Sequence, residues 1–158
     1  MDNNVFFIDD HFKDLISRLK SEGKRIVFTN GVFDIIHRGH IFYLLEAKSY
    51  GDVLIVGLNS DSSVKIIKGL DRPINKEADR AFVLANLKPV DYVVIFNENT
   101  PYDLISIVIP DVLVKGGDWK TEEIVGSDLV NKNGGKVISL RYIENYSTTN
   151  IVRKIAEN

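Results

Sequence analysis

The feature that most constrains the fold is a regular alternation of short, continuously apolar segments with segments of helical periodicity. The apolar segments that we expect to form strands are residues 25–29, 53–58, 92–96, 112–115 and 136–140. Helical spacing and helix-stop residues predict helices over residues 14–20, 38–50, 60–68, 76–87, 101–109, 127–132 and 148–156. Strands that are apolar throughout are typical of a parallel sheet that is covered on both faces. The sequence therefore predicts an α/β fold, a doubly wound parallel sheet of five strands with helices on both faces.

Composition and charge narrow the classes of function. The chain has 158 residues, which suits a single domain over residues 1–158 that buries roughly 70% of the surface of its unfolded chain. Its 20 Lys and Arg against 22 Asp and Glu give a net charge of −2, so no basic surplus favours nucleic-acid binding. The sequence has no cysteine for a disulfide or thiolate metal site, and no apolar run of the ~18 residues that a membrane helix needs. Because residues 1–10 also lack the features of a secretory signal, we expect a cytoplasmic protein with no membrane or nucleic-acid partner.

Two histidines and two glycines follow the first predicted strand, within the segment NGVFDIIHRGH at residues 30–40. Backbone N–H groups at the start of a helix attract phosphate, and Gly31 and Gly39 allow the backbone to approach a ligand closely. His37 and His40 are three residues apart, so both can face one point from the first helical turn and donate hydrogen bonds to a phosphate. A pair of helix-capping histidines, or half of a metal site, is the alternative interpretation.

This segment resembles the H-x-G-H nucleotidylyltransferase superfamily, and in particular its cytidylyltransferase-like branch, whose fold is Rossmann-like. Near the C-terminus, the stretch YSTTNI at residues 146–151 resembles the S-T-T-x-I signature that begins the last helix of that family. Ser and Thr before an apolar helix form an N-cap, and the same hydroxyl and N–H groups can bind phosphate. A plain helix cap is the alternative for this second motif.

The middle of the chain resembles one subgroup, the heptose 1-phosphate adenylyltransferases. The segments that carry this resemblance are residues 56–61, 64–65, 68–69, 72–75 and 113–119. This subgroup also occurs as the C-terminal half of a bifunctional heptose kinase/adenylyltransferase. The resemblance extends over roughly residues 13–155 and includes no kinase half, so we expect the stand-alone form.

The resemblance implies the transfer of AMP from ATP to D-glycero-D-manno-heptose 1-phosphate, giving ADP-heptose and pyrophosphate for surface glycan synthesis. Mg²⁺ would arrive with ATP and need no dedicated metal ligands from the protein. Family analogy also implies a homodimer.

The same resemblance implies roles for individual residues. In catalysis, His37 and His40 would stabilise the α-phosphate and Lys68 would neutralise phosphates. The residues implied in nucleotide binding are Val32, Phe33, Asp34, Gly39, His40, Asp118, Ser147, Thr148 and Thr149. Arg72 and Asp34 are implied in binding the sugar phosphate.

Several of these roles have a simpler alternative. Asp34 would brace its loop or orient a histidine, and Asp118 would face the nucleoside or merely favour its glycine turn. Lys68 and Arg72 could instead be ordinary solvated charges. For the whole protein, the alternatives are a cytidylyltransferase that acts on glycerol 3-phosphate or a similar alcohol phosphate, and a non-catalytic nucleotide-binding regulatory protein.

Overall fold

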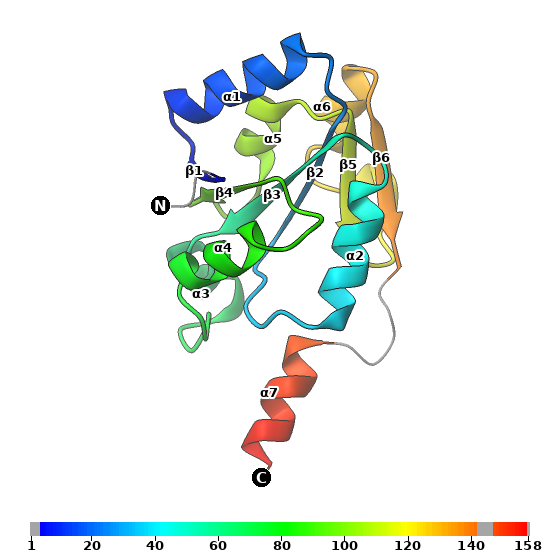
Figure 1. Cartoon of the computed structure of the whole chain (residues 1–158). Helices are drawn as coiled ribbons and strands as arrows, with labels where there is room; N and C mark the ends of the chain where they lie inside the picture. Colours follow the sequence, from blue (N-terminus) through cyan, green and yellow to red (C-terminus); the bar gives the residue numbers. More distant parts are fainter. Residues whose placement is uncertain (1–3, 142–146, 158) are drawn as a thin grey trace.

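A six-stranded parallel sheet runs through the computed structural model, which describes residues 4–141 and 147–157 (Figure 1). Its strands are β1 (Val5–Phe7), β2 (Ile26–Gly31), β3 (Val53–Asn59), β4 (Tyr92–Phe96), β5 (Val112–Gly116) and β6 (Lys136–Leu140). The order across the sheet is β1-β4-β3-β2-β5-β6, and every neighbouring pair is parallel. The doubly wound parallel architecture is therefore confirmed.

The predicted number of five strands is wrong, because β1 adds an edge strand beside β4. This strand has only three residues, and Asp9 follows it closely as the N-cap of the next helix. The apolar run at residues 5–8 is too short to predict a strand by itself, and β1 pairs with β4, whose residues lie far away in the sequence.

The helices form two layers that cover the two faces of the sheet (Figure 1). On one face lie α1 (Asp10–Ser21), α5 (Tyr102–Val108) and α6 (Ser127–Lys132). On the other lie α2 (Arg38–Lys48) and α4 (Glu77–Ala85). The remaining helical segments are α3 (Asp61–Lys68), the 3-10 turn η1 (Thr121–Glu123) and α7 (Thr148–Ala156). All residues of β3 are buried, which is why its sequence is apolar without alternation.

The strand order places the switch point of the sheet between β2 and β5. From β2 the chain moves through β3 to β4 on one side, and from β5 it moves to β6 on the other. Ligands of doubly wound sheets bind beyond the carboxyl ends of the two strands that flank this point. The relevant edge is therefore formed by the last residues of β2 and β5.

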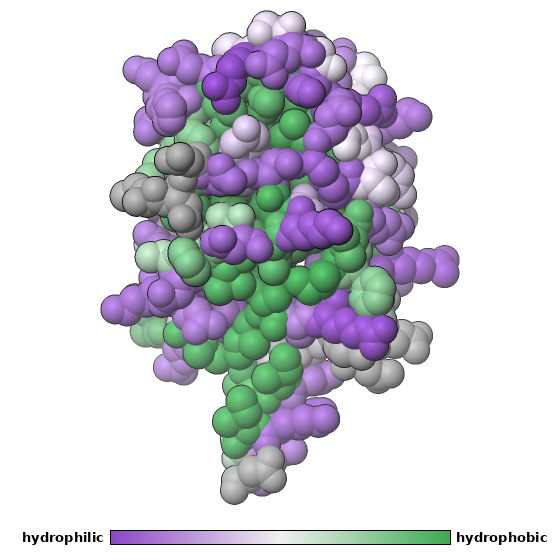
Figure 2. Space-filling view, viewed as in Figure 1, coloured by the Kyte–Doolittle hydropathy of each residue, from purple (hydrophilic) through white to green (hydrophobic). Residues whose placement is uncertain are grey.

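Helix α7 projects from the body of the molecule near this edge, and Figure 2 shows apolar surface along one side of the projection. None of its residues is buried, and Ile155 is 71% exposed. The described part of the chain contains no helix that is both long and apolar enough to span a membrane.

Aspartates at the opposite edge tie the starts of neighbouring strands together. Asp111, just before β5, accepts a hydrogen bond of 2.7 Å from the backbone N–H of Ile26 in β2. Asp91, just before β4, likewise accepts one of 2.6 Å from Leu54 in β3. These carboxylates satisfy N–H groups at the point where the parallel ladder ends.

We expect Asp111→Ala to lower the free energy of unfolding by about 1–3 kcal/mol, because it leaves the buried Ile26 N–H without an acceptor. Urea denaturation followed by circular dichroism measures this change. Asp111→Asn is the matched control, since its side-chain oxygen can still accept, and it should cost clearly less. Equal losses in the two variants would contradict the assigned role.

Candidate functional site

The loop that leaves β2 has a tight and strained start. Phe33 has a φ of 46°, in the left-handed region that side chains other than glycine rarely adopt, and it is buried. A Cβ at Gly31 would lie 3.0 Å from the Phe33 ring, so the ring packs directly over the glycine. Gly31 therefore permits the turn that carries the chain from the sheet edge to α2.

The two histidines of the H-x-G-H motif lie together at the start of α2, as their spacing predicts. His37 is the N-cap and His40 lies in the first turn, and their rings stack with centroids 3.8 Å apart. The backbone N–H of His37 donates to Nδ1 of His40 at 3.3 Å. A neutral ring that accepts at Nδ1 carries its proton on Nε2, so His40 is set as a hydrogen-bond donor.

Both imidazoles favour the neutral form. Burial lowers the pKa of His40 to about 4, and the neighbouring His37 acts in the same direction. Burial also lowers the pKa of His37. Near pH 7 the pair therefore offers hydrogen-bond donors without a full positive charge.

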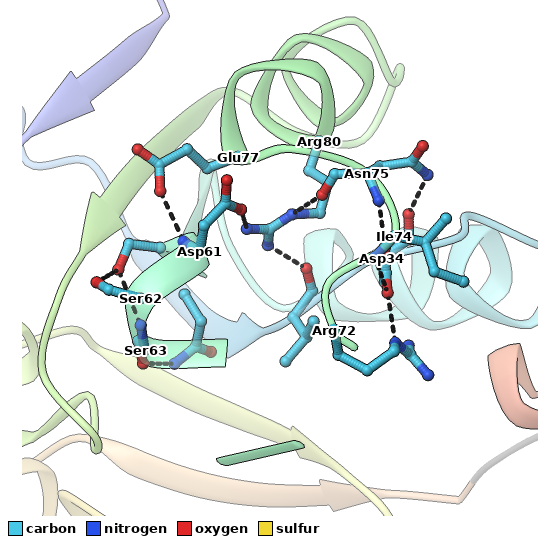
Figure 3. A network of polar contacts seen from close by, with 12 residues as sticks. Asp34, Asp61, Ser62, Ser63, Arg72, Ile74, Asn75, Glu77 and Arg80 are labelled. Carbon is cyan, nitrogen blue, oxygen red and sulfur yellow. Dashed lines mark hydrogen bonds and ion pairs between the residues drawn. The ribbon is translucent and has the colours of Figure 1, made fainter. Parts of the chain in front are cut away.

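The carboxylate of Asp34 binds the loop at residues 72–75 rather than either histidine (Figure 3). It accepts from Arg72 Nε at 2.8 Å and from the backbone N–H groups of Ile74 and Asn75 at 2.9 Å each. Burial alone would raise the pKa of this carboxyl, but hydrogen bonds from Asn75, Ile74 and Arg72 bring it below its ordinary value. Asp34 was predicted to brace the loop or to orient a histidine, and the geometry corresponds to bracing the loop.

A buried arginine, which the sequence analysis did not single out, joins three segments around the same loop (Figure 3). The Arg80 side chain is fully buried and donates to the carbonyl of Val32 at 2.7 Å, the carbonyl of Asn75 at 3.0 Å and the carboxylate of Asp61 at 2.8 Å. Arg80 lies beside Ala81 on the buried side of α4, and a charged residue at such a position of a predicted helix was the available sequence signal. Arg80 is thus a positioning residue for the loop after β2.

The S-T-T motif also meets this loop. Ser147 caps α7 by accepting from the backbone N–H of Asn150 at 3.1 Å, as predicted for an N-cap. The hydroxyl of Thr148 donates to the carbonyl of Ile35 at 3.3 Å, while Thr149 is exposed. The start of α7 is therefore attached to the segment between β2 and α2.

Lys68 is the last residue of α3 and lies exposed. It is close enough to Lys115, at the end of β5, to affect that residue electrostatically. Burial lowers the pKa of the Lys115 amine and the charge of Lys68 lowers it further. Lys115 Nζ also donates to Asn30 Oδ1 at 3.3 Å, across the switch point between β2 and β5. Neither Lys115 nor Asn30 was predicted as a site residue from the sequence, although a lysine that ends an apolar strand was a usable signal.

The remaining predicted residues differ in how close they lie to the histidines and in how exposed they are. Val32 and Gly39 belong to the loop and the first turn of α2. The Asp118 side chain is exposed, so its carboxylate faces solvent. Its Oδ1 lies 4.0 Å from Nε of Arg141, which is also exposed. Arg72 keeps about a quarter of its side chain exposed, at 24%. Over residues 4–141 and 147–157, no group of three or more His, Cys, Asp or Glu side chains could hold a metal ion.

Paired histidine donors, a helix start and the switch point of a doubly wound sheet define a nucleotidyltransferase domain. The sequence model of the cytidylyltransferase-like family matches residues 28–154, and the chain belongs to that family. Nucleotidyltransferases generally use a divalent metal ion together with the nucleotide.

Relatives named bifunctional protein HldE are similar to most of this chain. The relative from a Nitratiruptor species is 59% identical over 143 residues, which cover 90% of this chain. The relative from Aliarcobacter butzleri is 52% identical over 149 residues, which cover 94% of this chain. In both comparisons the chain spans only 30% of the length of the relative.

Solved structures show the same fold. A lipopolysaccharide core biosynthesis protein from Thermoplasma volcanium is 34% identical with a TM-score of 0.64, and the match covers 79% of this chain and 100% of that protein. A pantoate-beta-alanine ligase from Francisella tularensis is 20% identical with a TM-score of 0.58, covering 98% and 78% of the two chains. This second likeness extends to the fold alone.

We expect His40 to titrate near a pKa of about 4 in the folded protein, well below the ordinary value of 6.5, because its ring is buried beside His37. Between these two pH values the unfolded chain binds more protons, so the free energy of unfolding should fall as the pH drops from 6.5 toward 4. Side-chain ¹H–¹⁵N NMR follows the ring, and denaturation across this range follows the stability. His40→Ala should weaken the pH dependence, whereas His11→Ala should keep it. Titration of His40 near 6.5 would contradict the assigned environment.

We expect Arg80→Met to lower the free energy of unfolding by about 3–5 kcal/mol, because it leaves the partners of a buried guanidinium without a donor. Arg80→Lys retains the charge but not the three-way geometry, so an intermediate loss is expected. The exposed Arg18→Met is the matched control and should change stability little. A loss below about 1 kcal/mol for Arg80→Met, measured by urea denaturation, would show that the network is dispensable.

Proposed function

We propose that this protein transfers AMP from ATP to D-glycero-D-manno-heptose 1-phosphate, producing ADP-heptose and pyrophosphate. The observation that carries the proposal is the stacked His37 and His40 pair at the start of α2, with Nε2 of His40 set to donate to a phosphate. The heptose assignment draws on the resemblance of the middle segments and on the bifunctional HldE relatives. The likeness to a lipopolysaccharide core biosynthesis protein from Thermoplasma volcanium supports a supply route to a lipopolysaccharide-type glycan.

The reaction needs one displacement at phosphorus. An oxygen of the sugar 1-phosphate attacks the α-phosphorus of ATP in line, a new P–O bond forms, and the bond to the β-phosphate oxygen breaks to release pyrophosphate. His37 and His40 donate hydrogen bonds to the crowded α-phosphate, and Lys68 neutralises phosphate charge. Mg²⁺ that arrives with ATP supplies further charge neutralisation on the triphosphate.

The other predicted residues divide between the two substrates. Val32, Phe33 and Gly39 would place backbone N–H groups toward the nucleotide phosphates. Residues 147–149 at the start of α7 would hold the β- and γ-phosphates, which the attachment of Thr148 to the loop supports. We retain Arg72 for the phosphate of the sugar, with Asp34 holding its guanidinium, and Asp118 for the nucleoside side of the site.

We place this reaction in the cytoplasm and in a single domain, and we propose a homodimer as the working form. Support for a homodimer comes from α7, whose residues all remain unburied and whose Ile155 is largely exposed. Apolar side chains exposed together on one surface are typical of an interaction site.

The first test is pyrophosphate release with Mg²⁺, each of the four nucleoside triphosphates, and a panel of heptose 1-phosphates, hexose 1-phosphates and glycerol 3-phosphate. We expect release with ATP and a heptose 1-phosphate. Release with CTP and glycerol 3-phosphate would replace the substrate assignment, and ATP binding without any release would favour a regulatory protein.

In the same assay, we expect His40→Ala to lower kcat/KM by about 10²–10³-fold, because one preorganised donor to the transition state is lost. His11→Ala is the matched control, since His11 is exposed on α1. Circular dichroism should show that both variants fold. Near-normal turnover in His40→Ala would rule out the catalytic role of this histidine.

A further inference from the structure

The sheet splits along its switch point, between β2 and β5. These two strands pair for the last time at Phe28 and Leu113, although β2 continues to Gly31 and β5 to Gly116. On their outer sides both strands stay paired as far as these last residues, β2 with β3 and β5 with β6. The final residues of β2 and β5 are therefore neighbours that no backbone ladder joins to each other.

The hydroxyl of Tyr43 in α2 bridges this split. It donates to the carbonyl of Val114 in β5 at 3.3 Å and shares a hydrogen bond of 2.5 Å with the hydroxyl of Thr29 in β2. Because the proton of Tyr43 is directed to the carbonyl, Thr29 is the donor in the second bond. Thr29 is fully buried, so its hydroxyl needs a partner within the protein. One side chain of α2 thus joins both strands where their own pairing has ended.

Helix α2 is anchored to the sheet at two places beside its apolar contacts. Lys48, its last residue, pairs with the carboxylate of Asp91 at the opposite edge of the sheet. The buried residues of the helix, Leu44 and Ala47, lie between this ion pair and Tyr43. Tyr43 therefore stands at the start of the anchored part of α2, directly after the turn that carries the paired histidines.

We propose that Tyr43 is a positioning residue for the histidine pair, and that its hydroxyl fixes the start of α2 over the split between β2 and β5. Tyr43 follows His40 by three residues, so the two side chains lie on the same face of the helix. Side chains of a helix lean toward its start, which directs Tyr43 toward the first turn. This inference rests on the proposed function, which assigns the histidines to the α-phosphate.

The histidines offer directional hydrogen bonds, so their placement decides what they contribute. Burial lowers the pKa of both rings and favours their neutral forms. A hydrogen bond from a neutral donor weakens steeply as its distance and angle depart from the optimum. Misplacement of a reacting group by about 1 Å can lower a rate about 10²-fold. A helix start that is tied to both strands at the switch point supplies the rigid support that such donors need.

The first test needs neither ATP nor a sugar phosphate. Tyr43→Phe removes the hydroxyl and keeps the ring. We expect the pKa of His40 to rise by about 0.5 or more from its value of about 4, because a loosened first turn admits water to the ring. Side-chain ¹H–¹⁵N NMR measures this pKa. Tyr102→Phe is the matched control, since it removes the 3.0 Å hydrogen bond to Asp128 on the other face of the sheet and should leave His40 unchanged.

The second test separates positioning from substrate binding. With the substrates that the pyrophosphate assay selects, Tyr43→Phe should lower kcat about 10- to 100-fold. The KM for each substrate should change less than about threefold, because the histidines are assigned to the transition state rather than to ground-state binding. Circular dichroism should show that the variant folds, and Tyr102→Phe should keep the wild-type kcat.

Thr29→Val provides a second variant, which keeps the hydrogen bond from Tyr43 to Val114. It removes only the buried hydroxyl of β2 and should raise the pKa of His40 by a smaller amount than Tyr43→Phe does. The double variant should show no larger effect than Tyr43→Phe alone, because the two hydroxyl groups form one chain. Additive effects would contradict that chain. If Tyr43→Phe does not fold, Thr29→Val carries the same comparison with Tyr102→Phe.

The outcomes separate this inference from the proposed function. An unchanged His40 pKa or an unchanged kcat in a folded Tyr43→Phe protein would overturn the positioning role. Equal effects in Tyr102→Phe would trace the result to a general loss of stability and would overturn it as well. If the wild-type protein releases no pyrophosphate with any substrate of the panel, the proposed function fails. A raised His40 pKa in Tyr43→Phe would in that case still support the positioning of the histidine pair by Tyr43.

Discussion

The guanidinium of Arg80 lies at the centre of the loops that form the site. Its three hydrogen bonds reach the loop after β2, the loop at residues 72–75 and the start of α3 at Asp61. Asp34 then joins the first two of these segments a second time, through Arg72 and the backbone of residues 74 and 75. A buried cation is costly unless it is paired, so this network is stable only when all three segments are in place. The positions of the histidines and of the flanking loop are thus coupled to one buried interaction.

Much of the fold could be predicted because burial on both faces leaves a direct trace in the sequence. β3 and β4 are apolar nearly throughout, and each begins close to its predicted position. The start of α1 and the existence of β1 could not be predicted from an apolar pattern in this way. Helix α1 begins at Asp10, ahead of its predicted start, because the side chain of Asp9 accepts from the backbone N–H of Phe12 at 2.9 Å. β1 has too few residues to show a pattern and is defined by its partner strand.

The residues of the candidate site also fall into two groups, those that local sequence spacing predicts and those that depend on long-range contacts. His37, His40 and Ser147 are local features, whose spacing along the chain already places them at helix starts. Arg80 and Lys115 depend instead on where distant segments meet. A lysine after an apolar strand is ordinary until the order of the sheet places it beside β2 at the switch point. Sequence patterns could therefore locate the histidine pair and the cap of α7, but not the residues that hold the loops or that meet across the switch point.

The histidines and the lysines near the carboxyl edge of the sheet differ in the charge that they carry. Because burial lowers the pKa of both His37 and His40 and so favours their neutral forms, these rings offer directional hydrogen bonds rather than positive charge. The charge of Arg72 is already compensated in part by Asp34. The lysines at positions 68 and 115 supply the cationic charge on the sheet edge. The carboxyl edge of the sheet therefore combines neutral hydrogen-bond donors with the positive charge of these lysines, and a positive charge attracts anions at longer range than a neutral donor does.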